Sequence, residues 1–485
     1  MAIRIPVLAR RMQTRDAGFL YLEHAHTQLH IGCIAILEHT VARDALIARI
    51  EQRLPQLGRW AQRALAVPLA LGHPSWEDDP DFDAGQHVTR WCLPAPGGEG
   101  ELREVASLLL ARPLDRDRPL WEMHLIEGLA GGRCAVLQKV HHCMIDGVAG
   151  AQLLEMLLDP APAAAPAVSR APRCDAPLPE AGTRIARAIG DELALRARAT
   201  WQAIARPRAA LDAIGRLRHA AFSAFALAAG DVPTLPWNAT LGARRRVAFT
   251  RLPFDGIRAI RAAHGGSVND VVLAVLAGGL KRLLEAQGFD TRGVEPVALV
   301  PVSLRAPGDA ASLGNRISAM LVPLAVDPAG ELARLAATRA ITERLKASGA
   351  WTGIEALLEL ADGLPAPLVA LVGGRLSMGR LANLIATNVP GPRETRWLAG
   401  ARVEELRPIV PIADGIGLGV AVFSYDGWLH VGLQADADLV PDLAKLELGI
   451  EESFALLVAR SAPPPRRSEE SRPRRSRPKR MVRAH

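Results

Sequence analysis

The sequence predicts a mixed α/β (α+β) fold built from two halves, and three observations lead to this prediction. Short apolar runs typical of buried strands recur in both halves of the chain. These runs alternate with longer segments in which apolar residues recur at helical spacing. Residues 159–182 separate the two groups with six prolines and no helical period. Because 49% of the 485 residues are hydrophobic, each half can bury a core of its own.

The first half reads as strands that pair through a glycine turn, with helices alongside. A turn at Gly131-Gly132 joins two of these strands. The predicted strands are 29–38, 121–129 and 133–140, and helical spacing marks 42–54 and 150–158.

The second half begins after the proline-rich crossover, with helical patterning from 183 to about 227. A helix at 267–287 carries its own start signal, because Ser267 and Asp270 form a capping-box pattern. The predicted strands are 247–252, 296–304, 316–326 and 381–388, followed by a hairpin over 420–433 and a helix over 441–458.

These segments divide the chain into four parts, and charge marks the last of them. The parts are an N-terminal half at 1–158, a proline-rich and helical connector at 159–240, a C-terminal half at 241–460 and a tail at 461–485. The tail holds nine Lys or Arg and two Asp or Glu, which accounts for the whole net charge of +7. We expect it to be disordered, and we hypothesise salt-sensitive binding of this tail to anionic membranes.

Composition excludes several classes of protein. The five cysteines include no CxxC pair, which argues against a disulfide framework or a structural zinc site. Aromatic residues make up only 4% of the chain, and the body is formally neutral, so we expect no nucleic-acid partner. We find no signal peptide and no membrane-spanning run, and expect a cytoplasmic protein with peripheral contact at the inner membrane face or lipid droplets.

The sharpest chemical signal is the motif HHCMIDG at 141–147, which follows a predicted strand directly. A strand end fixes the backbone, while the following loop lets an imidazole face a cleft. Histidine suits proton removal because its unperturbed pKa of about 6.5 lies near neutral pH. Asp146 can orient a ring nitrogen or hold the loop to a cation, and Gly147 allows a tight entry into the next helix. We therefore favour a general base.

Three other interpretations of the motif stay open. His141 and His142 can be ordinary core residues, or they can bind a metal together with Asp146. A metal site would need a third ligand that the local sequence does not supply, and adjacent strand residues point to opposite faces. Cys143 beside His142 can also act as a nucleophile, although sequence neighbours rarely meet in the geometry that this requires.

Six motifs in a fixed order give the chain a family resemblance. They are PLDRDRPLWE at 113–122, HHCMIDG at 141–147, SVNDVVLA at 267–274, PVSLR at 301–305, GNRIS at 314–318 and NVPGP at 388–392. Together they resemble the bacterial wax ester synthase/diacylglycerol acyltransferase family from about Asp16 to Leu457. The chain departs from the usual pattern at Cys143-Met144, where Ala-Leu is commoner, and in its basic tail.

The resemblance implies a fold and a reaction. The fold would be two chloramphenicol-acetyltransferase-like halves with the active site in a tunnel between them. The reaction would be acyl-CoA-dependent O-acyl transfer to diacylglycerol or a long-chain alcohol, giving triacylglycerol or wax ester. Acyl-CoA would be a co-substrate, with no cofactor and no metal. Two alternatives remain: a condensation-type acyltransferase with another hydroxyl or amine acceptor, or a non-catalytic lipid-binding homologue.

The resemblance also implies site residues. His142 would be the general base, with His141 beside it, Asp146 mainly architectural and the Asn269-Asp270 pair implicated in activity. We assign Asn269 as an amide donor to the oxyanion, although helix capping also explains the local pattern.

The substrate-binding assignments are Gly147, Trp121, Asp270 and Arg305. Trp121 can equally be core, Arg305 and Arg316 can equally form structural ion pairs, and the NVPGP turn is expected to be structural.

Overall fold

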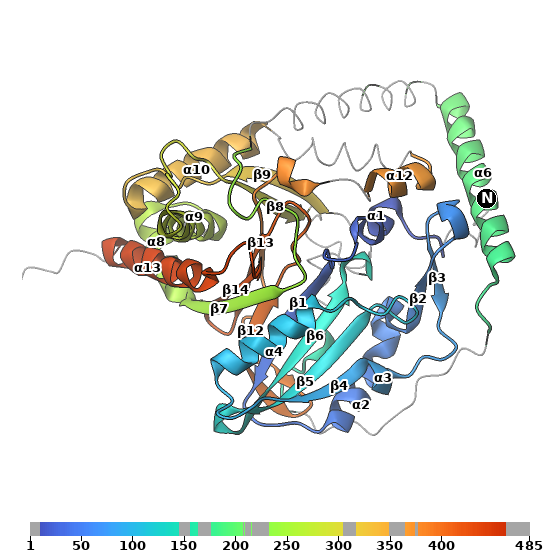
Figure 1. The fold of residues 1–485 in the computed structure, drawn as a ribbon, viewed down its shortest axis with the longest axis horizontal. Helices are drawn as coiled ribbons and strands as arrows, with labels where there is room; N and C mark the ends of the chain where they lie inside the picture. The colour runs from blue at the N-terminus through green and yellow to red at the C-terminus, as the bar shows by residue number, and fades with distance from the viewer. Residues whose placement is uncertain are drawn as a thin grey trace, which may run out of the picture.

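The computed structural model describes most of the chain. Two six-stranded sheets form the centre of the described part (Figure 1). The described residues are 10–144, 156–162, 176–206, 208, 215, 232–303, 317–348, 364–373 and 377–461. In these stretches, none of the helices has the length and apolar content that crossing a bilayer requires.

The N-terminal sheet combines strands from both ends of the chain. In spatial order they are β11 (Trp397–Leu398), β12 (Ala401–Ile409), β1 (His30–Leu37), β6 (Arg133–His141), β5 (Trp121–Leu129) and β4 (Val88–Cys92). Neighbours are antiparallel except β4 and β5. Two strands of the C-terminal half thus complete a sheet that the N-terminal half begins.

The C-terminal sheet is a separate mixed sheet. In spatial order its strands are β7 (Arg245–Pro253), β14 (Trp428–Asp436), β13 (Leu418–Tyr425), β10 (Leu384–Val389), β8 (Val297–Ser303) and β9 (Ile317–Pro323). Strand β10 runs parallel to both β13 and β8, while the other neighbours are antiparallel. A small hairpin of β2 (Gln62–Leu65) and β3 (Ser75–Asp78) lies apart from both sheets.

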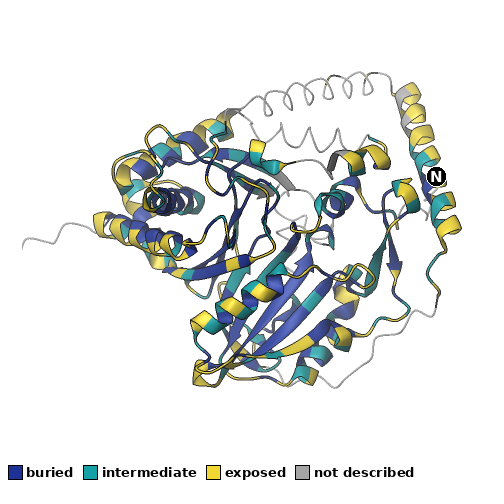
Figure 2. Ribbon diagram, viewed as in Figure 1, coloured by how far each residue is buried: buried dark blue, intermediate teal, exposed yellow. Residues whose placement is uncertain are grey.

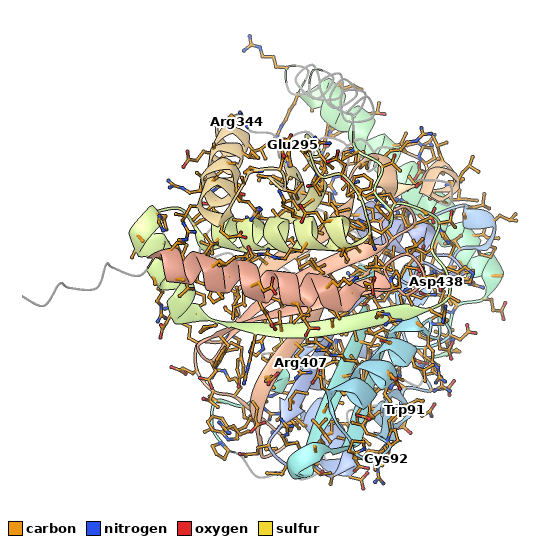
Figure 3. All side chains as sticks on the ribbon, turned by 60° about the vertical axis from the view of Figure 1, so that its left-hand side comes forward. Trp91, Cys92, Glu295, Arg344, Arg407 and Asp438 are labelled. Carbon is orange, nitrogen blue, oxygen red and sulfur yellow. The ribbon has the colours of Figure 1, made fainter. Side chains whose placement is uncertain are left out.

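The helices within the described residues are α1 (Thr14–Leu22), α2 (Arg43–Arg53), α3 (Ala84–His87), α4 (Glu99–Ala111), α6 (Ala181–Ala205), α8 (Phe254–His264), α9 (Val268–Ala286), α10 (Glu331–Ser348), α12 (Ala366–Gly373) and α13 (Leu443–Ser461). Helices such as α4, α9 and α13 pack against the sheets, while α12 packs on α1, and α6 lies at the edge of the molecule (Figure 1). Figure 3 shows α13 lying between α9 and β7, with which it packs. The sheets and the inner sides of these helices hold the buried residues (Figure 2).

Strand periodicity explains how the N-terminal sheet buries both faces. Successive side chains point to opposite sides, so Ile34, Ile36 and Leu137 face α4, while Ala35, Leu37 and Val136 face the core that contains α2. Phe249 of β7 joins the α4 side. Helix α4 therefore packs against the N-terminal sheet on one side and against a strand of the C-terminal sheet on the other.

Specific polar contacts hold the halves together. Arg103 of α4 donates two hydrogen bonds to the Glu447 carboxylate of α13, at 2.8 and 2.7 Å. Strands β14 and β12 approach so closely that a Cβ on Gly432 would lie 1.7 Å from the Pro408 carbonyl oxygen. Only glycine fits there without a shift of one sheet against the other.

The local predictions agree with the structure for most elements, and the differences have physical causes. Each strand and helix predicted within the described residues is present within a few residues, although α6 is described only to Ala205. The elements that were not predicted are strands β2, β3, β4, β11 and β12 and helices α1, α3, α4, α8, α10 and α12. Asp159, predicted to open the crossover, is buried and bridges to Trp397 of β11. The four-part division stays a prediction, with the addition that 397–409 pairs into the N-terminal sheet.

Candidate active site

The end of β6 places the two motif histidines. Strand β6 pairs with β1, and His141 lies opposite His30 at the last position of this pairing. The chain then turns into a short 3-10 helix at His142–Met144. The His142 backbone N–H donates to the Leu29 carbonyl at 2.8 Å, so the strand pairing holds His142 at the start of the turn.

His142 lies under helix α1. Its ring stacks on Phe19, with 3.9 Å between the ring centroids and 18° between the planes. Nδ1 of His142 is buried and has no hydrogen-bond partner among the described residues, while the residue as a whole is partly exposed. Burial lowers the pKa of His142 to about 4; His141 adds to the lowering, and an interaction with its own backbone opposes it. The ring is therefore neutral at pH 7, the state that a general base requires.

His141 takes part in a buried structural network instead. Its Nδ1 accepts the Cys143 backbone N–H at 3.1 Å, and its Nε2 lies 3.4 Å from the Glu23 carboxylate. This arrangement places the ring proton on Nε2, facing the carboxylate. Because its Nδ1 accepts the Cys143 backbone N–H, His141 stabilises the turn that carries His142.

Glu23 stays ionised within this network. It also accepts hydrogen bonds from Arg116 at 2.7 Å and from the Leu29 backbone at 3.1 Å. Burial raises the pKa of Glu23, but the hydrogen bonds and charges of His141 and Arg116 lower it more, to about 2. One carboxylate therefore ties the end of α1 to the motif.

A second polar cluster lies beside the first, at the C-terminal end of α4. Nζ of the fully buried Lys139 donates to the Leu109 and Arg112 carbonyls at 3.1 and 3.0 Å and lies 3.0 Å from Glu122. Nε2 of His30 lies 2.9 Å from the Leu110 carbonyl. These groups donate to carbonyls at the C-terminal end of α4, where hydrogen-bond partners within the helix run out; the Leu109 carbonyl also accepts the Arg112 backbone N–H at 3.3 Å. The sequence analysis missed Phe19, Glu23 and Lys139, which carry no local motif.

The position of Cys143 argues against its role as a nucleophile. Cys143 is buried in a core with Met12, Leu20 and Trp76, and burial raises the pKa of its thiol well above the usual value. A protonated, buried thiol is a poor nucleophile. Among the described residues, no group of three or more His, Cys, Asp or Glu is arranged to hold a metal ion. The metal interpretation of the motif includes Asp146, which lies outside these residues, so that interpretation stays open.

Asp270 is engaged in helix capping. Its Oδ2 accepts the Ser267 backbone N–H at 2.7 Å, and the Ser267 hydroxyl accepts the Asp270 N–H at 3.2 Å. Its Oδ1 accepts the hydroxyl of Thr342 from α10 at 2.8 Å. The predicted capping box is thus confirmed, while the assignment of Asp270 to substrate gains no support from these contacts. Asn269 is partly exposed in the first turn of α9, and its role as an oxyanion donor stays a prediction.

Trp121 lies in the core. Its ring is fully buried and stacks between Trp60 and His87, with centroid distances of 4.3 and 4.4 Å. Its indole N–H donates to the Trp60 carbonyl at 2.8 Å. Both faces of the ring are occupied by protein, so the substrate-binding assignment has no support from its position.

The NVPGP turn packs against the hairpin of β13 and β14. A Cβ on Gly391 would lie 2.3 Å from the Phe423 ring, and the Gly391 N–H donates to the Ser424 hydroxyl at 3.1 Å. These contacts favour the structural role that we expected for this turn. The remaining predicted site residues, Asp146, Gly147 and Arg305, lie outside the described residues, as does Arg316.

Comparison with known proteins identifies the family. Residues 12–272 match the model of the wax ester synthase/diacylglycerol acyltransferase catalytic domain, and 313–458 match the C-terminal domain of the same family. The chain belongs to the wax ester synthase/diacylglycerol acyltransferase family. It is 36% identical to tgs1 of Mycobacterium tuberculosis H37Rv, a probable diacylglycerol O-acyltransferase, over 92% of this chain and 96% of that one. This member of the family is an O-acyltransferase, as the resemblance implied.

Solved structures support the fold. The wax ester synthase/diacylglycerol acyltransferase from Marinobacter aquaeolei VT8 aligns with a TM-score of 0.66 and 24% identity, over 93% of this chain and 99% of that one. The starter condensation domain of rhizomide synthetase, solved with C8-CoA and Leu-SNAC, aligns with a TM-score of 0.55 and 14% identity, over 94% and 96%. The predicted architecture of two chloramphenicol-acetyltransferase-like halves is confirmed.

Proposed function

We propose that the chain transfers a fatty acyl group from acyl-CoA to the hydroxyl of diacylglycerol or a long-chain alcohol, with His142 as general base. The products would be triacylglycerol or wax ester. The observation that carries the proposal is the neutral imidazole of His142, fixed at a strand end and stacked on Phe19. The relationship to tgs1 supports diacylglycerol as acceptor, and the related fold solved with C8-CoA supports a CoA thioester as donor.

The reaction needs no covalent enzyme intermediate, because a thioester is already an activated acyl donor. The acceptor hydroxyl would donate its proton to His142 as its oxygen attacks the thioester carbonyl. The tetrahedral oxyanion would then collapse, breaking the C–S bond, and the imidazolium would return the proton to the departing thiolate. Since Nδ1 is buried, we assign the proton transfer to Nε2.

Burial makes His142 a weak base before substrate binds, with a pKa of about 4. The imidazolium that forms in the transition state would lie close to the new oxyanion, and this opposite charge would raise the pKa of the ring when proton transfer occurs. A positioned base contributes about 10²–10⁴ to the rate, and alignment of the two substrates and stabilisation of the oxyanion supply more. Asn269 is our proposed amide donor to the oxyanion.

Three predicted contacts complete the proposal. Asp146 would orient the motif loop, Gly147 would allow acyl chain or acceptor to approach it, and Arg305 would pair with a phosphate of CoA. The reacting groups would meet in a tunnel between the two halves. In this proposal the protein has acyl-CoA as co-substrate and requires neither a cofactor nor a metal.

The test compares His142→Ala with the parent, using palmitoyl-CoA and either hexadecanol or diacylglycerol as acceptor. We expect kcat/KM to fall by about 10²–10⁴. His39→Ala is the matched control, since His39 is an exposed histidine in the turn after β1, and it should behave as the parent. Transfer by His142→Ala at the parent's rate would remove the base assignment.

A second arm separates the alternatives. Transfer to an amine acceptor and not to a hydroxyl would favour the condensation-type enzyme. An inactive parent with every acceptor would favour a non-catalytic lipid-binding protein. A lipid acceptor also implies that the enzyme works at a lipid surface. We propose the cytoplasmic side of that surface, with the basic tail at 461–485 as one candidate contact.

A further inference from the structure

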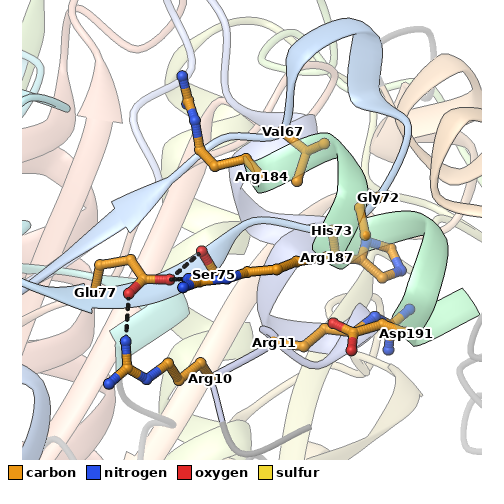
Figure 4. Close-up of a pocket in the computed structure, with 11 residues that line it drawn as sticks. Arg10, Arg11, Val67, Gly72, His73, Ser75, Glu77, Arg184, Arg187 and Asp191 are labelled. Atoms are coloured by element: carbon orange, nitrogen blue, oxygen red, sulfur yellow. Dashed lines mark hydrogen bonds and ion pairs between the residues drawn. The ribbon is translucent and has the colours of Figure 1, made fainter. Parts of the chain in front are cut away.

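A cavity lined mainly by basic side chains lies apart from the motif histidines (Figure 4). Its volume is about 290 Å³, close to the lower end of the range for small-molecule sites. Three stretches that are distant in the sequence form its walls: the segment before α1, residues 67–77, and the first turns of α6. Its polar lining residues are Arg10, Arg11, His73, Ser75, Glu77, Arg184, Arg187 and Asp191.

Helix α6 turns its inner side toward this cavity. Ala188 and Asp191 are buried there, while Leu193 on the other side of the helix is 63% exposed. The helix also approaches the opposite wall closely, because a Cβ on Gly72 would lie 2.6 Å from the Ala188 Cβ. The contacts that hold the first turns of α6 to the rest of the protein therefore surround the cavity.

Glu77 is shared between two arginines on different walls. Its carboxylate accepts hydrogen bonds from Arg10 at 2.8 Å and from the Ser75 hydroxyl at 3.0 Å, and Arg187 of α6 lies 3.4 Å away. The side chains of Arg10 and Arg187 are about half exposed, so both can turn toward a ligand. One carboxylate faces two guanidinium groups here, which leaves one positive charge in excess.

The other two arginines are less well neutralised. Arg184 donates to the Ala66 carbonyl at 2.6 Å, and its buried Nε has no hydrogen-bond partner among the described residues. Arg11 and Asp191 interact electrostatically, although no ion pair within 4.0 Å joins these two described side chains. Burial raises the pKa of Asp191, so its charge loses more to burial than it gains from Arg11 and Arg187. Four arginines against two acids leave an excess of two positive charges at pH 7.

His73 connects the cavity to helix α1 and adds no charge. Its two ring nitrogens lie 3.2 and 3.1 Å from the hydroxyls of Thr14 and Tyr21 on α1. Burial lowers the pKa of His73 to about 4, so the ring is neutral at pH 7. The same helix carries Phe19, which stacks on His142. The cavity is therefore separate from the proposed base, but one helix contacts both.

We propose that this cavity binds the phosphate group of a small solute, at a site separate from the residues that transfer the acyl group. Arg11 from the segment before α1 and Arg187 from α6 donate to the phosphate oxygens. A phosphate ester carries about −1.5 to −2 charges at pH 7, which matches the excess of the lining, whereas a carboxylate carries only one negative charge. The proposal goes beyond the proposed function and does not depend on it, because it concerns binding alone.

The chemistry of the lining favours phosphate over other anions. A guanidinium group is planar and pairs with two phosphate oxygens at once, and several such groups from different walls can surround one phosphate. A bound phosphate also removes the mutual repulsion of four like charges around one cavity. Two sources can supply this group: the phosphates of CoA, or a free anion such as pyrophosphate.

Isothermal titration calorimetry tests the proposal with two probes, sodium pyrophosphate and adenosine 3′,5′-bisphosphate, on the full chain at one fixed ionic strength. We expect one saturable site. Arg11→Gln/Arg187→Gln should weaken binding about tenfold or more, because each lost guanidinium removes charge-assisted hydrogen bonds. The matched control is Arg198→Gln/Arg206→Gln, which removes two exposed arginines outside the cavity, one on α6 and one just after it, and should bind as the parent.

A gain of affinity guards against loss of the fold. Asp191→Asn removes one acid from the lining and should tighten the binding of pyrophosphate about threefold or more, a change that misfolding does not produce. Circular dichroism should show that each variant is folded. Saturating pyrophosphate should raise the melting temperature of the parent more than that of Arg11→Gln/Arg187→Gln, because a ligand that binds only the folded state stabilises it.

The two probes distinguish the sources of the phosphate. If CoA is the source, the parent should bind the bisphosphate, which is the nucleotide end of CoA, more tightly than pyrophosphate. Arg11→Gln/Arg187→Gln should then also bind CoA itself more weakly. If a free anion is the source, pyrophosphate should bind more tightly, and the affinity for CoA should be equal in parent and variant.

Three results would overturn the proposal. They are no saturable binding of either probe to the parent, equal losses in Arg11→Gln/Arg187→Gln and in the matched control, and an unchanged affinity in Asp191→Asn. The second result would assign binding to the overall charge of α6 and not to the cavity. Because none of these measurements requires turnover, a failure of acyl transfer would refute the proposed function alone.

Discussion

Replacing Phe19 by alanine should raise the pKa of His142 and shift the acidic limb of the pH–rate profile. The Phe19 ring covers the imidazole at a centroid distance of 3.9 Å and keeps water from it. Its removal admits water to the ring and lowers the cost of placing a charge there. Because His142 must be neutral to accept a proton, kcat/KM falls as pH drops through its pKa.

The size of the effect follows from the pKa. Burial lowers the pKa of His142 to about 4, from an ordinary value of 6.5. At pH 5.5 a ring with a pKa of about 4 is about 97% neutral, while a ring with a pKa of 6.5 is about 9% neutral. The parent should therefore keep almost all of its kcat/KM at pH 5.5. Complete solvation of the ring would lower kcat/KM about tenfold at that pH. The kcat/KM of Phe19→Ala at pH 5.5 should lie between these two limits.

The assay follows release of CoA thiol in quenched aliquots between pH 4.5 and about 8, with a water-soluble alcohol as acceptor. Tyr21→Phe is the control, since Tyr21 lies on the same helix but its hydroxyl lies 3.1 Å from His73. Its profile should overlay that of the parent. A parent profile that falls with an apparent pKa near 6.5 would refute the reasoning, and so would a Phe19→Ala profile that does not move.

Three further predictions concern single residues. Glu23→Gln should lower the free energy of unfolding by about 2–3 kcal/mol above pH 4.5, because the depressed pKa of Glu23 stabilises the fold there. This stabilisation is lost as the pH falls toward 2. Urea unfolding of parent and variant at pH 7 and at pH 3 measures the difference. Cys143→Ala should keep the rate of acyl transfer within about threefold of the parent's, because a buried, protonated thiol is a poor nucleophile. An acyl-enzyme species that mass spectra detect in the parent and not in Cys143→Ala would contradict this prediction. Gly432→Ala should destabilise the protein by about 3 kcal/mol, since its methyl would meet the Pro408 carbonyl, and an unchanged melting temperature would count against the close approach.

Features with local causes were predicted well from sequence. The capping box of Ser267 and Asp270 depends on residues three positions apart, and both hydrogen bonds are present. The apolar runs of β1 and β6 identify buried strands because burial on both faces requires continuous apolar sequence. The position of His142 at a strand end was predictable because the HHxxxDG motif directly follows the apolar run of β6.

Features with distant causes were not predictable. Strand β12 has the sequence ARVEELRPI, whose four charged residues and proline obscure its alternation. Its place in the sheet depends on β1, far away in the sequence. Phe19 and Glu23 reach the motif from α1, and nothing near His142 signals them. Periodicity finds the amphipathic character of α6, but only the packing shows which side faces outward.

The shared sheet has a consequence for biosynthesis. Strand β1 is complete when the ribosome has passed residue 37, but β12, which pairs along it, begins at Ala401. During translation of the intervening chain, one edge of β1 stays open, and open edges recruit strands from other molecules. Nascent chains and fragments that stop before residue 400 should therefore self-associate and depend on chaperones. Strand β12, at residues 401–409, is therefore the segment that closes the open edge of β1 once the chain is nearly complete.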